Sequence, residues 1–477
     1  MNFELTSDLR RQLGYRLIDH IDDFYSSLPD RAVQLPVDQR TFCALDDPMP
    51  EEGSDPMRAL DEICRGMIEK GFHVPSANYF GLMNPTPTYM SFLGEALVAG
   101  LNPQLATQAR SQLASKIEVE TVRWIGQRVG WPRLFNGTFT SGGNEANFSG
   151  LALALAAKFP DAIEEGMAAI GGQPVIYASA ESHHSLDKSA GLLGIGRKSL
   201  RRIAVNERLQ MDPRVLESAI QADLQANRKP FCVIATAGTT SSGAIDALIA
   251  TAEICRRHKL WLHVDGAYGG ALIFSDKHRS LIDGIEQADS ITIDPHKWLA
   301  VPFAAGVILT RHPDVLERAF AVHAPYMPRD AGAVLPDNSR ISTQWTRRMN
   351  AMKLWLSLKV HGRKAYEEHI DRQMRLAQLF ADWVVQSEHY DLAAMPIVPI
   401  LNLRTKGHRN EQERAAIHEV IVAEVTRDGR RWISSSIVNG QSVIRVMVIS
   451  YLTGESHLVG LQEALRAAAQ LTAVART

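Results

Sequence analysis

Residues 260–270, LWLHVDGAYGG, and residues 290–299, SITIDPHKWL, decide the fold class of this chain. Each stretch opens with a short apolar run and reaches an aspartate, Asp265 in the first and Asp294 in the second. Apolar runs of this length, bounded by glycine or proline, are typical of buried β-strands. In both stretches the polar residues therefore follow the carboxyl end of a predicted strand.

Similar apolar runs lie on both sides of these two, and stretches with helical spacing separate them. Strands that alternate with helices predict an α/β fold, with a mostly parallel sheet covered on both faces. In such sheets, ligands bind at the carboxyl ends of the strands. The further runs are PVIYAS (174–179), FCVIATAG (231–238) and GVILT (306–310), and the helical stretches are Asn144–Lys158, Pro213–Asn227 and Ala247–His258.

The two ends of the chain differ from this central pattern. Residues 3–27 and Asp55–Lys70 predict two helices that look too small to form a core, and we expect them to wrap around a partner subunit. After residue 346, long helical stretches and a final alanine-rich helix (Gly454–Val474) predict a smaller α+β unit. We expect three units, at residues 1–75, 76–360 and 361–477.

Composition excludes several classes of function. The chain has 477 residues, 51 basic and 53 acidic, so no polybasic field favours nucleic acid. No stretch reaches the roughly 18 apolar residues of a membrane span, and the N-terminus does not resemble a signal peptide. The four cysteines lie far apart and predict neither disulfides nor a metal site. We expect a cytoplasmic protein with no membrane or nucleic-acid partner.

Lys297 and Asp265 carry the first chemical signal. Lys297 follows a predicted strand, at the ligand end of the sheet, although a lone lysine there is more often a surface residue. A buried carboxylate such as Asp265 needs a cationic or hydrogen-bonding partner. The nitrogen of a pyridinium ring is such a partner, and a structural cap is the alternative.

Two further stretches have the same position after a predicted strand. In FTSGGNEAN (139–147), glycines precede a helix, and backbone N–H groups at a helix N-terminus bind anions. In AESHHSLDKSA (180–190), His183 or His184 could stack on a flat ring or cap a helix. A metal site there is a poor alternative, because neighbouring side chains point apart and no third ligand is near.

Together these stretches supply an anion cradle, a ring stacker, a carboxylate and a lysine, which is the set that pyridoxal 5′-phosphate (PLP) requires. The lysine forms a Schiff base, and the carboxylate keeps the ring nitrogen protonated so that the ring accepts electrons.

At these residues the sequence resembles the group II PLP-dependent amino acid decarboxylases, which include the aromatic-amino-acid, glutamate and diaminobutyrate decarboxylases. The resemblance runs from about residue 75 to 455. It implies an aspartate aminotransferase-like fold of type I and a homodimer with its active site at the subunit interface. The motifs are TSGGNEAN (140–147), ATAGTTSSGAID (235–246), HVDGAY (263–268) and DPHKWL (294–299).

The resemblance also implies the role of each site residue. Lys297 is the Schiff-base lysine, Asp265 pairs with the pyridine nitrogen, and His183 stacks on the ring. Further cofactor contacts are Gly143, Asn144 and His296 at the phosphate, Thr240 near the ring hydroxyl, and Ala267 on the ring face opposite His183. The family often has asparagine where Asp294 stands, so we expect the Asp294 carboxylate to point away from the phosphate or to be paired.

Three residues concern the substrate. Tyr326, in HAPYM, stands where the family has a loop tyrosine that protonates the α-carbon after carbon dioxide leaves; relatives with phenylalanine there tend to make aldehydes. Arg445 either contacts the substrate carboxylate or forms a buried structural ion pair. Asn84 lies in the substrate-side segment, where aromatic residues of the aromatic-amino-acid decarboxylases are absent.

The predicted function is decarboxylation of an L-amino acid to an amine and carbon dioxide through a Lys297 Schiff base. One alternative is other chemistry on the same cofactor: an aldehyde-forming oxidative decarboxylase, a carbon–carbon lyase or an aminotransferase. A non-catalytic PLP-binding protein is the alternative from another class. The sequence does not name the amino acid.

Overall fold

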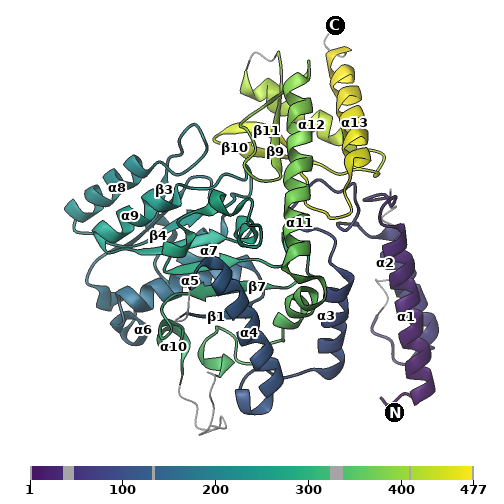
Figure 1. Ribbon diagram of the computed structural model, residues 1–477, viewed down its shortest axis with the longest axis horizontal. Helices are drawn as coiled ribbons and strands as arrows, with labels where there is room; N and C mark the ends of the chain where they lie inside the picture. The colour runs from purple at the N-terminus through teal and green to yellow at the C-terminus, as the bar shows by residue number, and fades with distance from the viewer. Residues whose placement is uncertain (1–2, 36–47, 132–134, 323–336, 408–409, 475–477) are drawn as a thin grey trace.

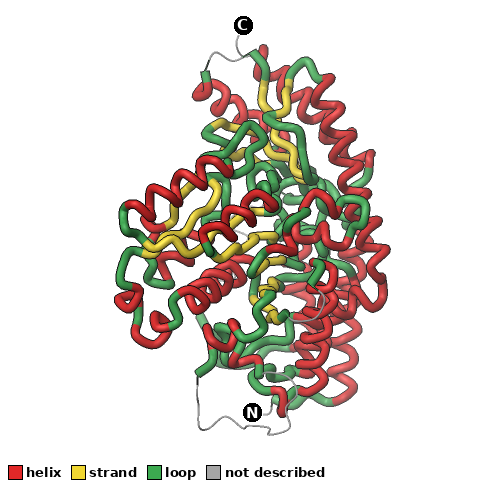
Figure 2. Tube along the Cα trace, turned by 60° about the vertical axis from the view of Figure 1, so that its left-hand side comes forward, coloured by secondary structure: helices red, strands yellow, loops and turns green. Residues whose placement is uncertain are grey.

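The computed structural model describes residues 3–35, 48–131, 135–322, 337–407 and 410–474. A large sheet with helices on both faces forms one part of the molecule, and a smaller sheet with its own helices forms another (Figures 1 and 2).

The large sheet has seven strands in the order β1-β7-β6-β5-β4-β2-β3. Strands β3, β2, β4, β5 and β6 are parallel neighbours, whereas β7 is antiparallel to both β6 and β1. The prediction of a mostly parallel sheet is confirmed. The strands are β1 (Asn136–Thr140), β2 (Pro174–Ser179), β3 (Leu200–Ile203), β4 (Lys229–Thr236), β5 (Trp261–Gly266), β6 (Ser290–Ile293) and β7 (Gly306–Thr310).

Successive apolar residues of a strand point to opposite faces of the large sheet, and helices cover both faces. In β4, Val233 and Ala235 join one buried cluster, while Cys232 and Ile234 join another. A strand buried on both faces needs apolar residues at every position. Helices α4 (Gln112–Val129), α8 (Pro213–Gln225) and α9 (Leu248–His258) supply the first cluster, and α5 (Gly143–Lys158), α7 (Ser185–Leu192) and α10 (Val315–Phe320) supply the second.

The smaller sheet is antiparallel, in the order β10-β11-β9-β8. Helix α11 (Ala351–Gln386) extends from the large sheet to this one (Figure 1) and has a non-helical residue, Gly362, with φ 73°. Gly362 lies next to residues 360–361, where the sequence predicts the boundary between the second and third units. The three predicted units stay a prediction. The other elements here are β8 (Tyr390–Leu392), β9 (Ile400–Thr405), α12 (Glu411–Thr426), β10 (Ser434–Val438), β11 (Gln441–Met447) and α13 (Glu455–Val474).

Helices α1 (Ser7–Ser27) and α2 (Pro56–Lys70) lie together along one side of the molecule (Figure 1), and α3 (Tyr89–Leu101) follows them. Neither α1 nor α2 has a buried residue. Asp61 joins them by accepting hydrogen bonds from Arg16, at 2.6 Å, and His20, at 2.7 Å. Among the described residues, no helix is long and apolar enough to cross a membrane.

Candidate active site

The carboxyl ends of β5 and β6 place Asp265 and Lys297 at the same edge of the large sheet. The two strands are parallel neighbours, and Asp265 pairs in register with Thr292. A turn then carries Lys297, whose N–H donates to the carbonyl of Asp294 at 2.9 Å. Asp265 is buried, whereas the Lys297 side chain is 20% exposed.

The Asp265 carboxylate is held on both oxygens. Oδ1 accepts from the backbone N–H of Ala267 at 3.1 Å, and Oδ2 accepts from Asn147 Nδ2 at 2.9 Å. Asn147 lies on α5, one turn beyond Gly143, with its side chain buried. The two donors stabilise the ionised form that a protonated ring nitrogen would need as its partner.

A chain of hydrogen bonds continues from Asn147 into the sheet. Asn147 Oδ1 lies 3.1 Å from His263 Nε2, and His263 Nδ1 lies 2.8 Å from Ser290 Oγ. Trp261 Nε1 donates to that same Ser290 oxygen at 2.9 Å. Burial lowers the pKa of His263 to about 4, so the ring is neutral at pH 7.

His183 lies beside the same two charged residues. Its Nδ1 accepts from the N–H of Ser185 at 3.1 Å, which leaves the proton on Nε2. His183 is exposed, and partial desolvation is the largest effect on the pKa of its side chain, which it lowers. The Asp265 charge raises the pKa and the Lys297 charge lowers it further. His183 is thus within electrostatic reach of both predicted catalytic groups.

The N-terminus of α5 forms a cradle in which a side chain would not fit. A Cβ at Gly142 would lie 3.0 Å from His296 Cε1, and one at Gly143 would lie 2.9 Å from Asp294 Oδ2. The Gly143 N–H donates to Asp294 Oδ2 at 2.8 Å. Glycines at these two positions therefore bring the helix end against the DPHK turn.

Asp294 points into this cradle. Its Oδ2 lies 3.8 Å from Lys297 Nζ, and its buried Oδ1 has no hydrogen-bond partner among the described residues. His296 Nδ1 is 3.0 Å from Oδ1 but accepts from the N–H of Ala305, also at 3.0 Å. The expectation was that Asp294 either points away from the phosphate or is paired, and Oδ2 is paired with the Gly143 N–H. Gly143 accordingly donates its N–H to Asp294 in this structure.

Arg445 approaches the site from the smaller sheet. It is 6% exposed, and Nη1 donates to the carbonyl of Thr240 at 3.2 Å, while Nε donates to Ser434 Oγ at 3.3 Å. Burial lowers its pKa, and the Tyr79 hydroxyl lies close enough to affect it. No carboxylate pairs with Arg445 in the part of the chain that the structure describes, so the alternative of a structural ion pair is not supported.

The remaining predicted residues differ in how well the structure places them. Ala267 is 7% exposed and packs near the position of a Gly143 Cβ, at 3.2 Å. Asn144 is exposed in the first turn of α5. Asn84 is half-buried and makes no hydrogen bond to another described residue. Tyr326 lies outside the described residues.

These residues fit PLP on two observations. A primary amine and a buried carboxylate follow neighbouring parallel strands at one edge of the sheet. The glycine cradle is backed by a helix N-terminus, which suits a phosphate. In the ranges that the structure describes, no group of three or more His, Cys, Asp or Glu residues could hold a metal ion.

Sequence reasoning missed Asn147 as the partner of Asp265. Its spacing held the signal: Asn147 stands four residues after Gly143, so both face the same side of the predicted helix. Glu145 was also missed; it accepts from the Ser141 N–H at 2.7 Å and from Gln344 Nε2 at 2.9 Å. Nothing in the sequence indicates the Gln344 contact, which joins distant segments.

Comparison with known proteins agrees with the site. The sequence model described as "Pyridoxal-dependent decarboxylase conserved domain" matches residues 39–406. An aromatic-L-amino-acid decarboxylase of Bacillus atrophaeus is 30% identical over 474 residues, covering 98% of this chain and 97% of that protein. The acidic amino acid decarboxylase GADL1 of Homo sapiens is 32% identical over 357 residues, covering 74% and 68%.

Solved structures agree on the fold. The crystal structure of mouse CSAD is 25% identical, has a TM-score of 0.92, and covers 98% of this chain and 99% of that chain. A structure of Oryza sativa TDC with PLP and tryptamine is 24% identical, with a TM-score of 0.93 and coverage of 99% and 100%. The predicted fold of type I, with a smaller C-terminal unit, is confirmed.

Proposed function

The chain belongs to the family of pyridoxal-dependent decarboxylases, and on that premise we propose that Lys297, Asp265 and His183 form its catalytic centre. The family's activity is PLP-dependent decarboxylation of amino acids, and the chain is a carboxy-lyase of this kind. The observation that carries the assignment of residues is that Asp265 and Lys297 follow the carboxyl ends of neighbouring parallel strands, with the glycine cradle of α5 against the same turn.

Each residue has a distinct task in this proposal. PLP, when bound, withdraws the electron pair that carbon dioxide leaves behind. The primary amine of Lys297 would hold the cofactor covalently. The Asp265 carboxylate, which accepts from Asn147 and from the Ala267 N–H, would pair with a protonated ring nitrogen.

The other cofactor contacts follow from their positions. His183 would stack on one ring face, and Ala267 would pack on the other, where its small side chain leaves room for a flat ring. The α5 N-terminus, with Gly143, Asn144 and His296, would hold the phosphate. Thr240, whose carbonyl accepts from Arg445, would lie near the ring hydroxyl. Closure of the site around the substrate excludes water and strengthens these charged contacts.

Arg445 and Tyr326 act on the substrate in this proposal, and Asn84 lines its pocket. Among the described residues, the buried guanidinium bonds to a carbonyl and a hydroxyl but to no carboxylate, and a substrate carboxylate would supply the counter-ion. Tyr326 returns a proton to the α-carbon, so that the product is an amine.

We infer a cytoplasmic homodimer with the active site at the subunit interface. Helices α1 and α2 bury none of their residues, and three of their large apolar side chains, Tyr15, Ile63 and Met67, are more than half exposed. A partner subunit would cover these apolar side chains. Sedimentation tests this inference: a fully active monomer would contradict it.

Lys297→Ala tests the assignment of the catalytic centre. The wild-type protein should show the visible absorbance of bound PLP and release carbon dioxide, and Lys297→Ala should lose both. Lys188→Ala, at an exposed lysine of α7, is the matched control and should keep both. A Lys297→Ala variant that kept the absorbance and turned over substrate would contradict the assignment.

The substrate requires a separate screen, because the named relatives act on different classes of amino acid, aromatic in one case and acidic in another. The panel is the twenty common amino acids plus ornithine and diaminobutyrate, with amine and carbon dioxide measured together. Equal yields of the two products indicate simple decarboxylation, whereas aldehyde in place of amine indicates the oxidative alternative.

A further inference from the structure

A cavity of about 600 Å³ opens at the opposite edge of the large sheet from Lys297. It lies where β5 begins at Trp261 and where Asp289 precedes β6. The antiparallel β7 ends at the same edge and leads into Arg311 and His312. Its size is within the range of small-molecule sites, which is roughly 300–1,000 Å³.

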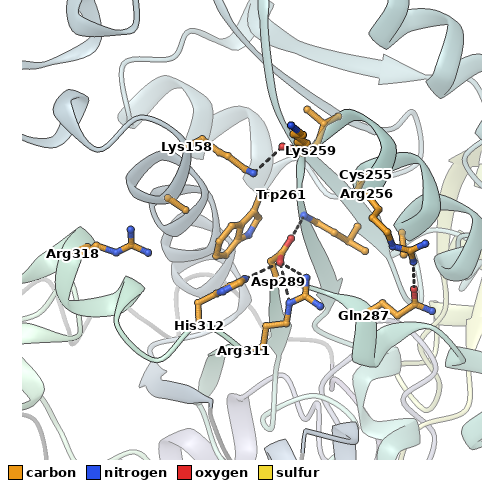
Figure 3. A pocket seen from close by; sticks show the side chains of 14 residues that line it. Lys158, Cys255, Arg256, Lys259, Trp261, Gln287, Asp289, Arg311, His312 and Arg318 are labelled. Carbon is orange, nitrogen blue, oxygen red and sulfur yellow. Dashed lines mark hydrogen bonds and ion pairs between the residues drawn. The ribbon is translucent and has the colours of Figure 1, made fainter.

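Basic side chains surround this cavity, which we call the basic bowl. Figure 3 shows them on all sides of Trp261 and Asp289. Its five Lys and Arg side chains face a single carboxylate, that of Asp289, in a protein whose net charge is −2. The five are Lys158, Arg256, Lys259, Arg311 and Arg318.

The Asp289 carboxylate is already occupied by its neighbours. It accepts from the guanidinium of Arg311, from His312 Nε2 at 2.8 Å and from the N–H of Leu262 at 2.8 Å. These partners hold the pKa of Asp289 below its ordinary value against the effect of burial. Asp289 therefore neutralises Arg311 and pairs with none of the other four Lys and Arg side chains of the bowl.

Three of these cations lack a carboxylate partner within the described ranges. Lys158 Nζ donates to the carbonyl of Lys259 at 2.8 Å, and Arg256 Nη2 donates to Gln287 Oε1 at 3.0 Å. The Lys259 ammonium makes no hydrogen bond to another described residue, while Arg318 pairs with the exposed Asp314 at 3.1 Å. These three cations lie where the C-terminal ends of two helices meet: Lys158 is the last residue of α5, Arg256 is in the last turn of α9, and Lys259 caps α9.

The floor of the bowl is apolar. Trp261, Leu260 and Leu262 are buried in β5 and the residue before it, and Ala252 and Cys255 of α9 lie beside them. A ligand in the bowl would place negatively charged groups against the Lys and Arg side chains and could pack an apolar group against this floor. Because the bowl and Lys297 lie at opposite ends of β5 and β6, such a ligand would not compete with PLP.

We propose that the basic bowl binds the polyphosphate group of a small molecule such as a nucleoside di- or triphosphate. Several cations without carboxylate partners, arranged around one cavity, suit a ligand with several adjacent negative charges better than a single carboxylate. The simpler explanation is that basic residues at helix C-termini only oppose the helix dipoles. That explanation accounts for the cations but predicts no stoichiometric binding.

Calorimetric titration of the PLP-loaded enzyme tests the proposal, because PLP then fills the phosphate cradle near Lys297. The probes are ATP, tripolyphosphate, AMP and inorganic phosphate. We expect ATP and tripolyphosphate to bind one per chain and at least about tenfold more tightly than inorganic phosphate. Comparison of ATP with tripolyphosphate shows whether the nucleoside contributes. No heat, or equally weak binding of all four probes, would overturn the proposal.

Two variants locate the binding. Arg256→Gln combined with Lys259→Gln should weaken ATP at least about tenfold, with the visible absorbance of PLP and the melting temperature unchanged. Arg257→Gln is the matched control, since Arg257 lies on the same helix but pairs with Glu217 and does not line the bowl. Equal ATP affinity in the double variant and the wild type would place the ligand elsewhere and overturn the proposal.

Discussion

The side-chain amide of Asn147 joins Asp265 to His263 in one defined orientation. Its nitrogen must face the Asp265 carboxylate, 2.9 Å away, because a carboxylate only accepts. Its oxygen then faces His263 Nε2, 3.1 Å away, which must carry the proton. Nδ1 of the neutral ring accepts from the Ser290 hydroxyl. A single amide thus fixes the tautomer of the histidine and supports the charge of Asp265.

The first prediction concerns Asn147. Asn147→Asp, which is isosteric, places a negative charge beside Asp265 and should lower kcat by about 100-fold or more, because the two carboxylates compete for a proton. Asn147→Ala removes one donor and should lower kcat by about tenfold. The pH dependence of the visible absorbance should shift in both variants. If Asn147 served packing alone, the isosteric variant would be the milder of the two.

The second prediction concerns Asp294, whose Oδ2 accepts from the Gly143 N–H in the phosphate cradle. Asp294→Asn removes a negative charge that would repel the phosphate but keeps an acceptor for Gly143. The dissociation constant of PLP from the apo-protein should fall by about three- to tenfold. Fluorescence titration measures it, with Asp283→Asn, at an exposed aspartate, as the control. Weaker PLP binding in Asp294→Asn would show that the carboxylate supports the cofactor.

The third prediction separates the two roles of Arg445. If it binds the substrate carboxylate, Arg445→Met should raise KM about 100-fold or more, while the free energy of unfolding stays the same or increases, because an unpaired buried charge is removed. Arg445→Lys should recover part of the affinity. Steady-state kinetics and denaturant unfolding of both variants measure these effects. If Arg445→Met lowered the free energy of unfolding and left KM unchanged, Arg445 would have a structural role.

The fourth prediction concerns Tyr326. Tyr326→Phe removes the hydroxyl proton while keeping the ring, so protonation of the α-carbon should slow and the product should shift from amine toward aldehyde. Chromatography of both products under air measures the ratio. Unchanged amine output from Tyr326→Phe would remove Tyr326 from the mechanism.

The sequence predicted those parts of the fold and the site that depend on local pattern. Strands β5 and β6 and helices α5 and α9 lie within three residues of their predicted bounds, because apolar runs and glycine stops mark them. Helix α4 and strand β3 were missed. Leu200–Ile203 is too short and polar at its centre to stand out, and it forms a strand because it pairs with β2.

Residues that act through long-range contacts were not predictable. The contact between Asp294 and Gly143 spans 151 positions, and the direction of the carboxylate depends on how α5 packs against the DPHK turn. The basic bowl likewise joins the ends of α5 and α9 with the residues after β7, and no single stretch of sequence shows that charge excess. By contrast, Lys297 and Asp265 were found because the strands that carry them are neighbours in sequence.

The last prediction concerns acid stability. Burial lowers the pKa of His263 to about 4, compared with about 6.5 in an unfolded chain. Below pH 6.5 the unfolded state therefore binds a proton that the folded state excludes, so stability falls as the pH falls from 6.5 toward 4. Between pH 7 and pH 5 this one residue should account for about 2 kcal/mol of lost stability. His369, with its pKa also lowered to about 4 by burial, should add to the loss.

Denaturant unfolding of the apo-protein at pH 7 and pH 5 measures this loss. His263→Gln should make the difference between the two pH values smaller by about 2 kcal/mol, because glutamine does not titrate and still offers a donor and an acceptor to Asn147 and Ser290. His184→Gln is the control, since the His184 side chain is 96% exposed. An undiminished pH difference in His263→Gln would mean that His263 is charged in the folded protein. The neutral tautomer of His263 would then be wrong, and its Nδ1 would donate to the Ser290 hydroxyl instead of accepting from it.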